Sequence, residues 1–460
     1  MDSSFGGLNT ALSALYAQQR GLAVTGQNIA NANTEGYSRQ RVQMRAVGGP
    51  PVGAIYSVDN GVGGGVEVAA VTRLQDELLV SRSRTEHAQD SYLTGVKSTY
   101  AQVEQIFSEP SDTGLQAQLG ELWSNLHDLA NNPGDLATRS TVLQQAQVVV
   151  TGFNSAHANL AASWTVSRQV LDSRLTEVNT TADTVAQLNQ AIRAAVNAGS
   201  PSNSLVDQRD AGIMRLSELT GATTINRNDG TVDVYLSGSI LVGGDVARHL
   251  QATGATRLED EGIVPVVVQW TDTLATASVA GGEVAAGMQA LGQILPTQSA
   301  SLDQIAVSLM TVVNTQHTAG YDLNGTAGVA LFSGTGAADL AVAITDPHLV
   351  AASATPGGNL DGTNATALAA LATVTGGPDV AYRQMIANLG VTAQSAGRRV
   401  SIQDGVKQQV DSALAAQAGV NLDEEMTNML AYQRAYEAAA RVMSVIDSSL
   451  DTLINHMGVG

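Results

Sequence analysis

One stretch of the chain limits the possible folds more than any other. Residues 135–198 contain no proline and a single glycine, Gly152. Their apolar residues recur at steps of three and four, as the buried face of a helix requires. Because an α-helix rises 1.5 Å per residue, this segment would form a rod of about 95 Å. A helix of that length cannot wrap around a compact core, so the sequence predicts an elongated helical protein.

Further elements are predicted on both sides of this rod. Helical spacing recurs at 70–108, 114–130, 204–220, 283–318 and 378–418. We expect Pro296 to break the fourth of these helices, because proline lacks the backbone N–H that a helix needs. Asn228-Asp229-Gly230 is a hairpin signal between two short runs of strand-forming residues. The sequence therefore predicts a small β-rich insertion, with an irregular region at 319–377.

Both ends of the chain carry apolar residues at steps of seven, which is typical of a helix that pairs with another helix. The N-terminal row, in segment 4–32, consists of Leu8, Leu15, Leu22 and Ile29, with Leu12 beside it. The C-terminal rows consist of Leu422, Met429, Tyr436, Met443, Leu450 and Met457, and of Tyr432, Ala439, Ile446 and Leu453. Asn421 or Asp423 would cap the C-terminal helix. Glu425 is the one charge on its second row.

These elements divide the chain into three units. We expect residues 1–66 and 419–460 to form an inner coiled-coil domain with an extended arm, since 31–66 is rich in Asn, Gly and Pro. Residues 67–220 and 283–418 would form a helical rod domain. Residues 221–282 would form an outer β-rich domain. The predicted fold class is mainly α with a β-rich insertion.

Composition excludes several classes of function. The chain has 460 residues and no cysteine, which rules out disulfides and thiolate metal sites. Its formal net charge is −19, from 42 acidic and 23 basic residues. Non-specific binding of nucleic acid or of an anionic membrane needs a basic surface, so we expect neither partner. No apolar run reaches the roughly 18 residues of a membrane span.

No catalytic motif emerges from the sequence. The seven histidines are scattered, and no pair stands at helical spacing for a metal. Asp423, Glu424 and Glu425 lie in the first turn of the last helix, where negative charge complements the helix dipole. In the segment 205–210 acids neighbour Arg209, which favours an exposed, salt-bridged helix face. We expect no cofactor, no metal site and no enzymatic activity.

The two ends of the chain resemble a known protein family. Residues 28–40 read Asn-Ile-Ala-Asn-Ala-Asn-Thr-Glu-Gly-Tyr-Ser-Arg-Gln, and the runs at 419–426, 432–442 and 450–455 form a matching C-terminal motif. Both are similar to the axial rod, hook and hook-associated proteins of the bacterial flagellum. The triplet 38–40 and the middle segments at 107–114, 129–134, 205–210 and 314–325 most resemble the family of hook-associated protein 1. Glu35 stands where that family usually has proline.

The resemblance implies a structural adaptor that joins hook to filament. Such proteins leave the cell through the flagellar type III export channel, and their terminal helices are mobile in the monomer and ordered on assembly. The implied partners are further copies of the chain in a tubular ring, hook protein, the next hook-associated protein and a dedicated export chaperone. The implied motif residues are Asn28, Asn31, Asn33, Thr34, Gly36, Tyr37 and Ser38.

Two alternatives remain open at this point. The chain could be another axial protein, such as hook or distal rod, although Ser38-Arg39-Gln40 argues against this. More remotely, it could carry an enzyme, such as a peptidase, in the β-rich insertion or in 319–377. The second alternative would require a pocket that gathers His, Asp and Ser, or two carboxylates.

Overall fold

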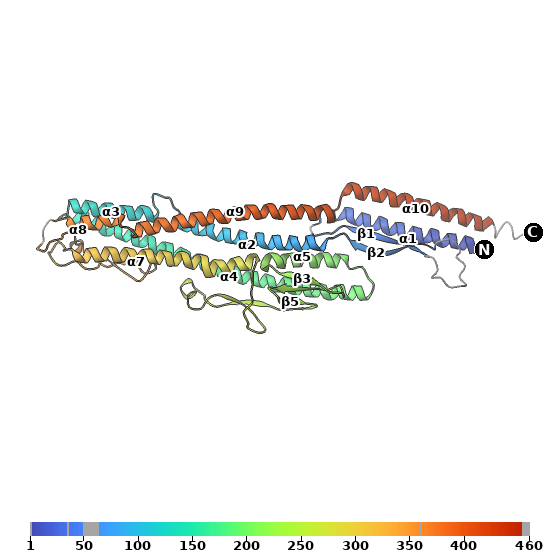
Figure 1. Cartoon of the computed structure of the whole chain (residues 1–460), viewed down its shortest axis with the longest axis horizontal. Coiled ribbons are helices and arrows are strands. Elements are labelled where there is room, and N and C mark those ends of the chain that lie inside the picture. The colour runs from blue at the N-terminus through green and yellow to red at the C-terminus, as the bar shows by residue number, and fades with distance from the viewer. Residues whose placement is uncertain (1, 35, 49–63, 358–360, 453–460) are drawn as a thin grey trace, which may run out of the picture.

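The computed structural model describes residues 2–34, 36–48, 64–357 and 361–452. The molecule is elongated, and the two ends of the chain lie at the same end of its long axis (Figure 1). Helices make up most of the fold and are joined by small sheets. The predicted fold class is confirmed at this level. None of the helices that the structure describes is long and apolar enough to span a membrane.

The longest helix is α4, Leu136–Asn197, with 62 residues. Asp135 caps its start, because the Asp135 side chain accepts hydrogen bonds from the N–H groups of Ala137 and Thr138. Phe153, Leu160 and Trp164 lie on its fully buried face. The predicted rod helix is therefore confirmed to within one residue at each end.

The other rod helices pack along α4 or along each other. Their bounds are α2 Glu77–Phe107, α3 Leu115–Asn131, α5 Asn203–Thr220, α6 Gly282–Gln289, α7 Leu295–Ala319, α8 Thr363–Ala369 and α9 Pro378–Ala418. α3 and α5 pack on α4, and α9 packs along α2. The prediction of helix from residue 70 was wrong at its start. Residues 70–73 belong to a strand, and Asp76 caps α2 by accepting from the N–H groups of Leu78 and Leu79.

Pro296 does not break its helix as predicted. α6 continues into a π-helical turn, Ala290–Ile294, and then into α7. The Leu295 N–H bonds to the Ala290 carbonyl, which leaves the Leu291 carbonyl without its usual helical donor. Trp164 Nε1 on α4 donates to that carbonyl at 3.0 Å. A wider turn and one indole thus accommodate the proline without ending the helix.

The β-rich insertion lies beside α4 and α5 (Figure 1). Its four-stranded antiparallel sheet has the order β3 Thr223–Asn226, β4 Val232–Leu236, β5 Ser239–Gly243 and β6 Val246–Ala247. A second pair joins β7 Leu250–Thr253 to β8 Val267–Trp270, with the 3-10 turn Leu258–Asp260 between them. The pairing of β3 with β4 confirms the predicted hairpin at 228–230. Asn189 of α4 fixes this sheet by donating to the carbonyls of Val232 and Gly244.

The region 319–377 is irregular, as predicted. It holds the short strands β9 Phe332–Ser333 and β10 Ala341–Val342, the 3-10 turns Pro347–Leu349 and Ala370–Thr373, and α8. Its buried residues join the core formed by α3, α4 and α7.

The two ends of the chain form one unit at one end of the rod. It comprises α1 Asp2–Ala30, the antiparallel hairpin of β1 Gln40–Val47 and β2 Gly65–Arg73, and α10 Leu422–Asp451. Asn421 is the N-cap of α10, because the Asn421 side chain accepts from the N–H groups of Asp423 and Glu424. The described part of the expected extended arm is thus a β-hairpin, and residues 49–63 lie outside the described part.

Candidate functional site: an assembly interface

α1 and α10 lie side by side and run in opposite directions (Figure 1). Three contacts define their register: Gly7 with Ile446, Gly21 with Tyr432, and Asn28 with Glu425. From one contact to the next, α1 advances by 14 and then 7 residues, and α10 retreats by the same numbers. A Cβ on Gly21 would lie 2.8 Å from Tyr432 Cδ1, so a side chain at residue 21 would force the Tyr432 ring to move.

The predicted apolar rows lie in and around this contact. On α1, Leu8, Leu15, Leu22 and Ile29 stand one residue beyond the contact row and are half-buried, while Leu12 is exposed. On α10, Tyr432 and Ile446 face α1, and the row beside them is half-buried at Met429, Met443 and Leu450 and exposed at Leu422 and Tyr436. Leu453 and Met457 lie outside the described residues.

Much of α10 is uncovered in the single chain. Met426, Leu430, Val442 and Val445 are between 51% and 66% exposed. Tyr16 on α1 is 64% exposed. Among the described residues of α10, only Glu425 and Ala439 are buried. The terminal helix pair therefore presents apolar side chains that no part of the described chain covers.

A buried polar cluster closes the rod-proximal end of the pair. We call Asn28, Tyr37, Arg39 and Glu425 the terminal lock. The Asn28 side chain is 1% exposed and donates to Glu425 Oε2 at 2.9 Å and to the Gln40 carbonyl at 2.8 Å. Its oxygen accepts from Tyr37 Oη at 2.8 Å and from the Gln40 N–H at 3.0 Å. Every hydrogen-bonding position of this amide is thereby satisfied.

Arg39 supplies the positive charge of the terminal lock. Its guanidinium lies 2.7 Å from Glu425 Oε1 and 2.7 Å from Glu424 Oε2. Burial alone would lower the pKa of Arg39, but the hydrogen bonds and charges of Glu424 and Glu425 outweigh it and raise that pKa. Burial, together with the charges of Asp207 and Glu425, raises the pKa of Tyr37 to about 12. Glu424 and Glu425, in the first turn of α10, therefore form ion pairs with Arg39 in addition to complementing the helix dipole.

A second ionic cluster attaches the hairpin to the rod. Arg73, at the end of β2, lies 2.8 Å from Asp207 Oδ1 and 2.9 Å from Asp210 Oδ2, and it donates to Ser38 Oγ. Burial raises the pKa of Asp207. The prediction of an exposed, salt-bridged face at 205–210 was right about the salt bridges and wrong about the exposure, since Asp207 is 8% and Arg209 is 6% exposed. Arg73 of the hairpin pairs with Asp207, and Arg209 donates to the Gly230 carbonyl in the turn between β3 and β4. Sequence spacing within one helix cannot reveal either contact.

The remaining motif residues shape the turn between α1 and β1. Asn31 Nδ2 donates to the Gln27 carbonyl, and Thr34 Oγ1 donates to Asn31 Oδ1. Gly36 has a φ of 77°, a conformation that glycine adopts without strain. Asn33 is exposed, and Glu35 lies outside the described residues.

Sequence reasoning missed the pairing of Arg39 with Glu425. One signal could have revealed it, because Glu425 interrupts an otherwise apolar row. A charge at such a position is retained only when a partner neutralises it. That partner is 386 residues away in the chain, so periodicity alone could not name it.

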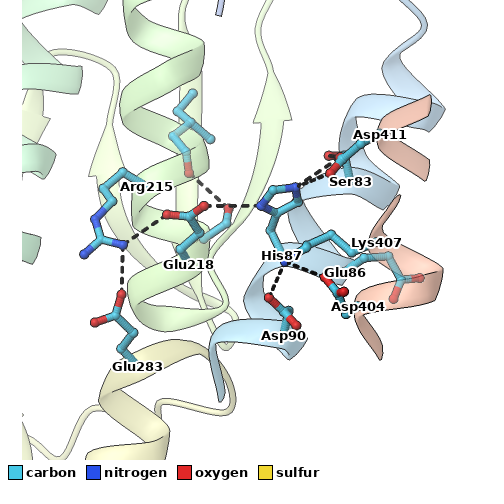
Figure 2. Close-up of polar contacts among 12 residues, drawn as sticks. Ser83, Glu86, His87, Asp90, Arg215, Glu218, Glu283, Asp404, Lys407 and Asp411 are labelled. Atoms are coloured by element: carbon cyan, nitrogen blue, oxygen red, sulfur yellow. Dashed lines mark hydrogen bonds and ion pairs between the residues drawn. The ribbon is translucent and has the colours of Figure 1, made fainter. Parts of the chain in front are cut away.

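A third polar cluster holds α9 against α2 and α5, just before the chain enters α10. Figure 2 shows His87 of α2 between Glu218 of α5 and Asp411 of α9. Its Nδ1 lies 3.3 Å from Glu218 Oε1, and its Nε2 lies 3.1 Å from Asp411 Oδ1. On the same helix faces, Lys407 Nζ donates to Asp90 Oδ2 at 2.6 Å. The hydrogen bond to Glu218, reinforced by Asp411, raises the pKa of His87 above its usual value of 6.5.

This cluster predicts a pH dependence of stability. Protonated His87 can donate to both carboxylates, whereas the neutral ring can donate to one. Because the pKa is higher in the folded chain, the stabilisation is complete below about pH 6.5 and is lost as the pH rises through the folded value. We expect His87→Gln to lower the free energy of unfolding by on the order of 1 kcal/mol at about pH 6, and by less at about pH 9. Urea unfolding at both pH values measures this, and an equal effect at both would contradict it.

The described residues contain no group of three or more His, Asp or Glu side chains that could hold a metal ion. One cavity of about 680 Å³ lies between α2, α5 and the end of α9. Its lining includes His87 and Arg73 beside apolar residues such as Val80, Met214 and Leu414. His87 and Arg73 are both engaged in the contacts described above. The geometry is that of helices held together by polar clusters, with an apolar face left open.

The ends of the chain define its class. Residues 8–37 match the family of the flagella basal body rod protein, and residues 414–456 match the C-terminal region of the flagellar basal body rod FlgEFG protein. These two segments contain most of α1, the turn that follows it, and α10. The chain is therefore an axial protein of the bacterial flagellum.

The middle of the chain identifies the family. Residues 100–332 match the helical domain of flagellar hook-associated protein FlgK. Flagellar hook-associated protein 1 of Bacillus subtilis is 30% identical to this chain, and the match covers 100% of both. The chain belongs to the flagellar hook-associated protein 1 family, as the resemblance of its motifs indicated.

Two more distant comparisons agree. Flagellar hook-associated protein 1 of Escherichia coli is 28% identical over 71% of this chain, and the match spans 59% of that protein's length. The solved structure of the flagellar hook junction protein FlgK from Burkholderia pseudomallei aligns with a TM-score of 0.64. That alignment covers 72% of this chain and 99% of the other at 16% identity, so it supports the fold alone.

Proposed function

We propose that this protein is a structural adaptor at the junction of hook and filament, and that it assembles through its terminal helices. The observation that carries the proposal is the apolar face of the α1–α10 pair. Met426, Leu430, Val442 and Val445 are each more than half exposed in a helix whose described residues include only two buried side chains. Large apolar side chains left exposed in this number on one helix favour an interaction site there.

The physical argument links this face to a tube. Identical chains that repeat one interface around an axis form a ring or a helical tube. A helix with one covered and one open apolar side gains its remaining stability when a neighbour covers the open side. The pair would thus form the inner wall of the tube, and the coiled-coil packing predicted from the steps of seven would be completed between chains. The rod and the β-rich domain at 221–282 would lie outside it.

The proposed partners follow from that position. They are further copies of this chain, hook protein on one side and the next hook-associated protein on the other. Export through the flagellar type III channel with the help of a dedicated chaperone is part of the same proposal. In this role the protein performs no catalysis and holds no cofactor, and its important residues are those of the terminal pair.

Immunogold labelling of isolated flagella tests the location. Antibodies raised against the β-rich domain should mark one narrow band where the hook meets the filament. Label along the whole hook would identify the chain as hook protein, and label below the hook would identify it as a rod protein. Either pattern would overturn the junction assignment. A strain that lacks the protein should show no label.

A further inference from the structure

The last two turns of α9 are joined to the rod by few side-chain contacts. Val410 is the last buried residue of α9, and none of the residues 411–418 is buried. Within those turns, Asp411 makes the polar contacts to α2, because its carboxylate accepts from Ser83 Oγ at 3.1 Å and lies 3.1 Å from His87 Nε2. Whatever holds Asp411 therefore holds the end of α9, the segment that leads into α10.

The geometry around His87 is that of a charged ring. Its Nδ1 faces a carboxylate oxygen of Glu218 on α5, and its Nε2 faces the carboxylate of Asp411 on α9 (Figure 2). A neutral imidazole has one N–H, so one of these contacts would set a nitrogen lone pair against a carboxylate. The imidazolium donates at both positions. One proton thus decides whether His87 can bind both helices at once.

The two carboxylates differ in what else neutralises them. Glu218 Oε2 also accepts from Arg215 Nη1 at 3.0 Å, so its charge has a permanent partner. Among the ion pairs of the described residues, Asp411 has His87 alone as its partner. A neutral ring that still donates one hydrogen bond leaves Asp411 without a positive charge nearby. Loss of the proton therefore weakens the hold on α9 and spares the charge balance of Glu218.

The turn of α9 that precedes Asp411 is held independently of His87. Lys407 Nζ donates to Asp90 Oδ2 of α2 at 2.6 Å, and this bond raises the pKa of Lys407 above its usual value of 10.5. One turn earlier, Gln403 Nε2 donates to Glu86 Oε2 at 2.7 Å. Neither contact changes its charge when His87 titrates. Any release of α9 is thus confined to the residues after Lys407.

The cavity of about 680 Å³ beside Asp411 gives the end of α9 room to move and water a route to the carboxylate. The other ionisable groups that line it are Tyr37, Arg73, Arg84 and Asp210, in addition to the partners of His87 already named. Arg73 and Arg84 both lie within ion-pair distance of Asp210, which occupies their charge. Tyr37 stays neutral, since its pKa is raised to about 12.

We propose that His87 is a proton-dependent clip, whose charged form fastens residues 411–418 of α9 to α2 and α5 and whose neutral form frees them. The helix stays attached up to Lys407 in both forms. This claim concerns the rod of the isolated chain. In the proposed junction, and resting on that proposed function, the clip would make the hold on the segment that enters the inner tube depend on the pH outside the cell.

Hydrogen exchange of the isolated full chain at about pH 6 and about pH 9 tests the clip. Exchange rates are divided by the intrinsic rate at each pH, so that the protection of each segment is compared. We expect the protection of residues 411–418 to fall at least about threefold from the lower pH to the higher, which is the size of effect that a partly exposed ion pair gives. Protection of residues 385–405 should stay the same.

Two substitutions of His87 should have opposite effects. His87→Gln carries no charge at either pH, so residues 411–418 should show the low protection at both. His87→Arg is charged at both, and the adjoining cavity has space for the longer side chain, so the high protection should persist at about pH 9. Asp411→Asn removes the partner instead of the clip and should abolish the pH response. A pH response that survives in His87→Gln or in Asp411→Asn would overturn the proposal.

Two controls distinguish the clip from a general effect of pH. Glu218→Gln should keep the response of residues 411–418, shifted to lower pH, because Asp411 still faces the ring. His348→Gln removes a histidine that pairs with Asp346 in the irregular region and should leave the response unchanged. Equal loss of protection in both segments of the unchanged chain, no loss in either, or no protection of 411–418 at about pH 6 would each overturn the clip. Failure of the labelling experiment would refute the proposed function and leave these results intact.

Discussion

Replacing Met426 and Leu430 with aspartate should prevent incorporation of the protein into the flagellum while the isolated chain stays as stable as before. The two side chains are 54% and 52% exposed in the single chain. Substitutions at such positions usually change the free energy of unfolding by no more than about 0.5 kcal/mol. Burial of each side chain against a neighbour would contribute about 1.5–3 kcal/mol, and an aspartate there loses that contribution and adds desolvation of a charge. A loss of about 3 kcal/mol per site weakens association roughly 100-fold.

The measurement is rescue of motility and of filament attachment in a strain that lacks the protein, together with urea unfolding of the purified chain. Matched controls lie on other surfaces. Ile402→Asp on α9 and Ile263→Asp in the β-rich domain alter side chains that are 70% and 81% exposed. We expect both controls to assemble. Normal filaments with Met426→Asp and Leu430→Asp combined would show that this face is not the assembly interface.

Changes at Met443 or Leu450 are expected to block assembly by a less direct route. Both side chains are half-buried beside the contact with α1. An aspartate at either position should weaken the terminal pair itself as well as contacts between chains, and should leave the rod folded. Comparing these variants with Met426→Asp therefore distinguishes a damaged pair from a damaged interface. Normal incorporation of either variant would contradict the role of this row.

Trp164 should be the most sensitive single position of the rod. Its side chain is fully buried, and its indole N–H donates to the Leu291 carbonyl that the π-turn leaves free. Trp164→Phe keeps most of the volume but leaves that carbonyl unsatisfied, which should cost about 1–3 kcal/mol. Trp164→Ala also creates a cavity and should cost about 3–5 kcal/mol. The measurement is the urea midpoint followed by circular dichroism.

A second substitution tests the reason for this sensitivity. Pro296→Ala supplies the backbone N–H that the helix lacks, so in the Trp164→Phe background it should recover part of the lost stability. In the otherwise unchanged chain the same substitution should have a smaller effect, because the indole already satisfies the carbonyl. Equal effects in both backgrounds would show that Trp164 and Pro296 act independently.

Local sequence patterns were sufficient for most of the rod. α4 and α10 could be predicted from residues close to one another in the chain. Apolar residues recur at regular helical steps, proline is absent, and Asp135 and Asn421 cap the two helix starts. The motif at residues 28–40 was recognisable because the turn after α1 requires particular residue types at consecutive positions. One exception is Pro296, whose effect depended on Trp164, a residue more than 100 positions earlier in the chain.

Local sequence patterns could not predict contacts between segments that are distant in the chain. Periodicity predicted that α1 and α10 carry apolar rows. It did not predict that glycines on α1 would face Tyr432 and Ile446, with the leucine row displaced to the side. It also could not show that Arg73 of β2 pairs with Asp207, or that Arg209 donates to the Gly230 carbonyl in the turn between β3 and β4. Burial depends on what packs against a helix.

The sequence by itself determined the elongated helical architecture, the small β-rich insertion and the family, because helix periodicity, turn residues and terminal motifs are local properties of the chain. The tertiary structure alone decided which helix faces are covered and which charges are buried. Glu425 illustrates the difference. Its carboxylate is a helix-start charge in the sequence and a buried ion-pair partner in the fold, since only folding brings Arg39 within 2.7 Å of it.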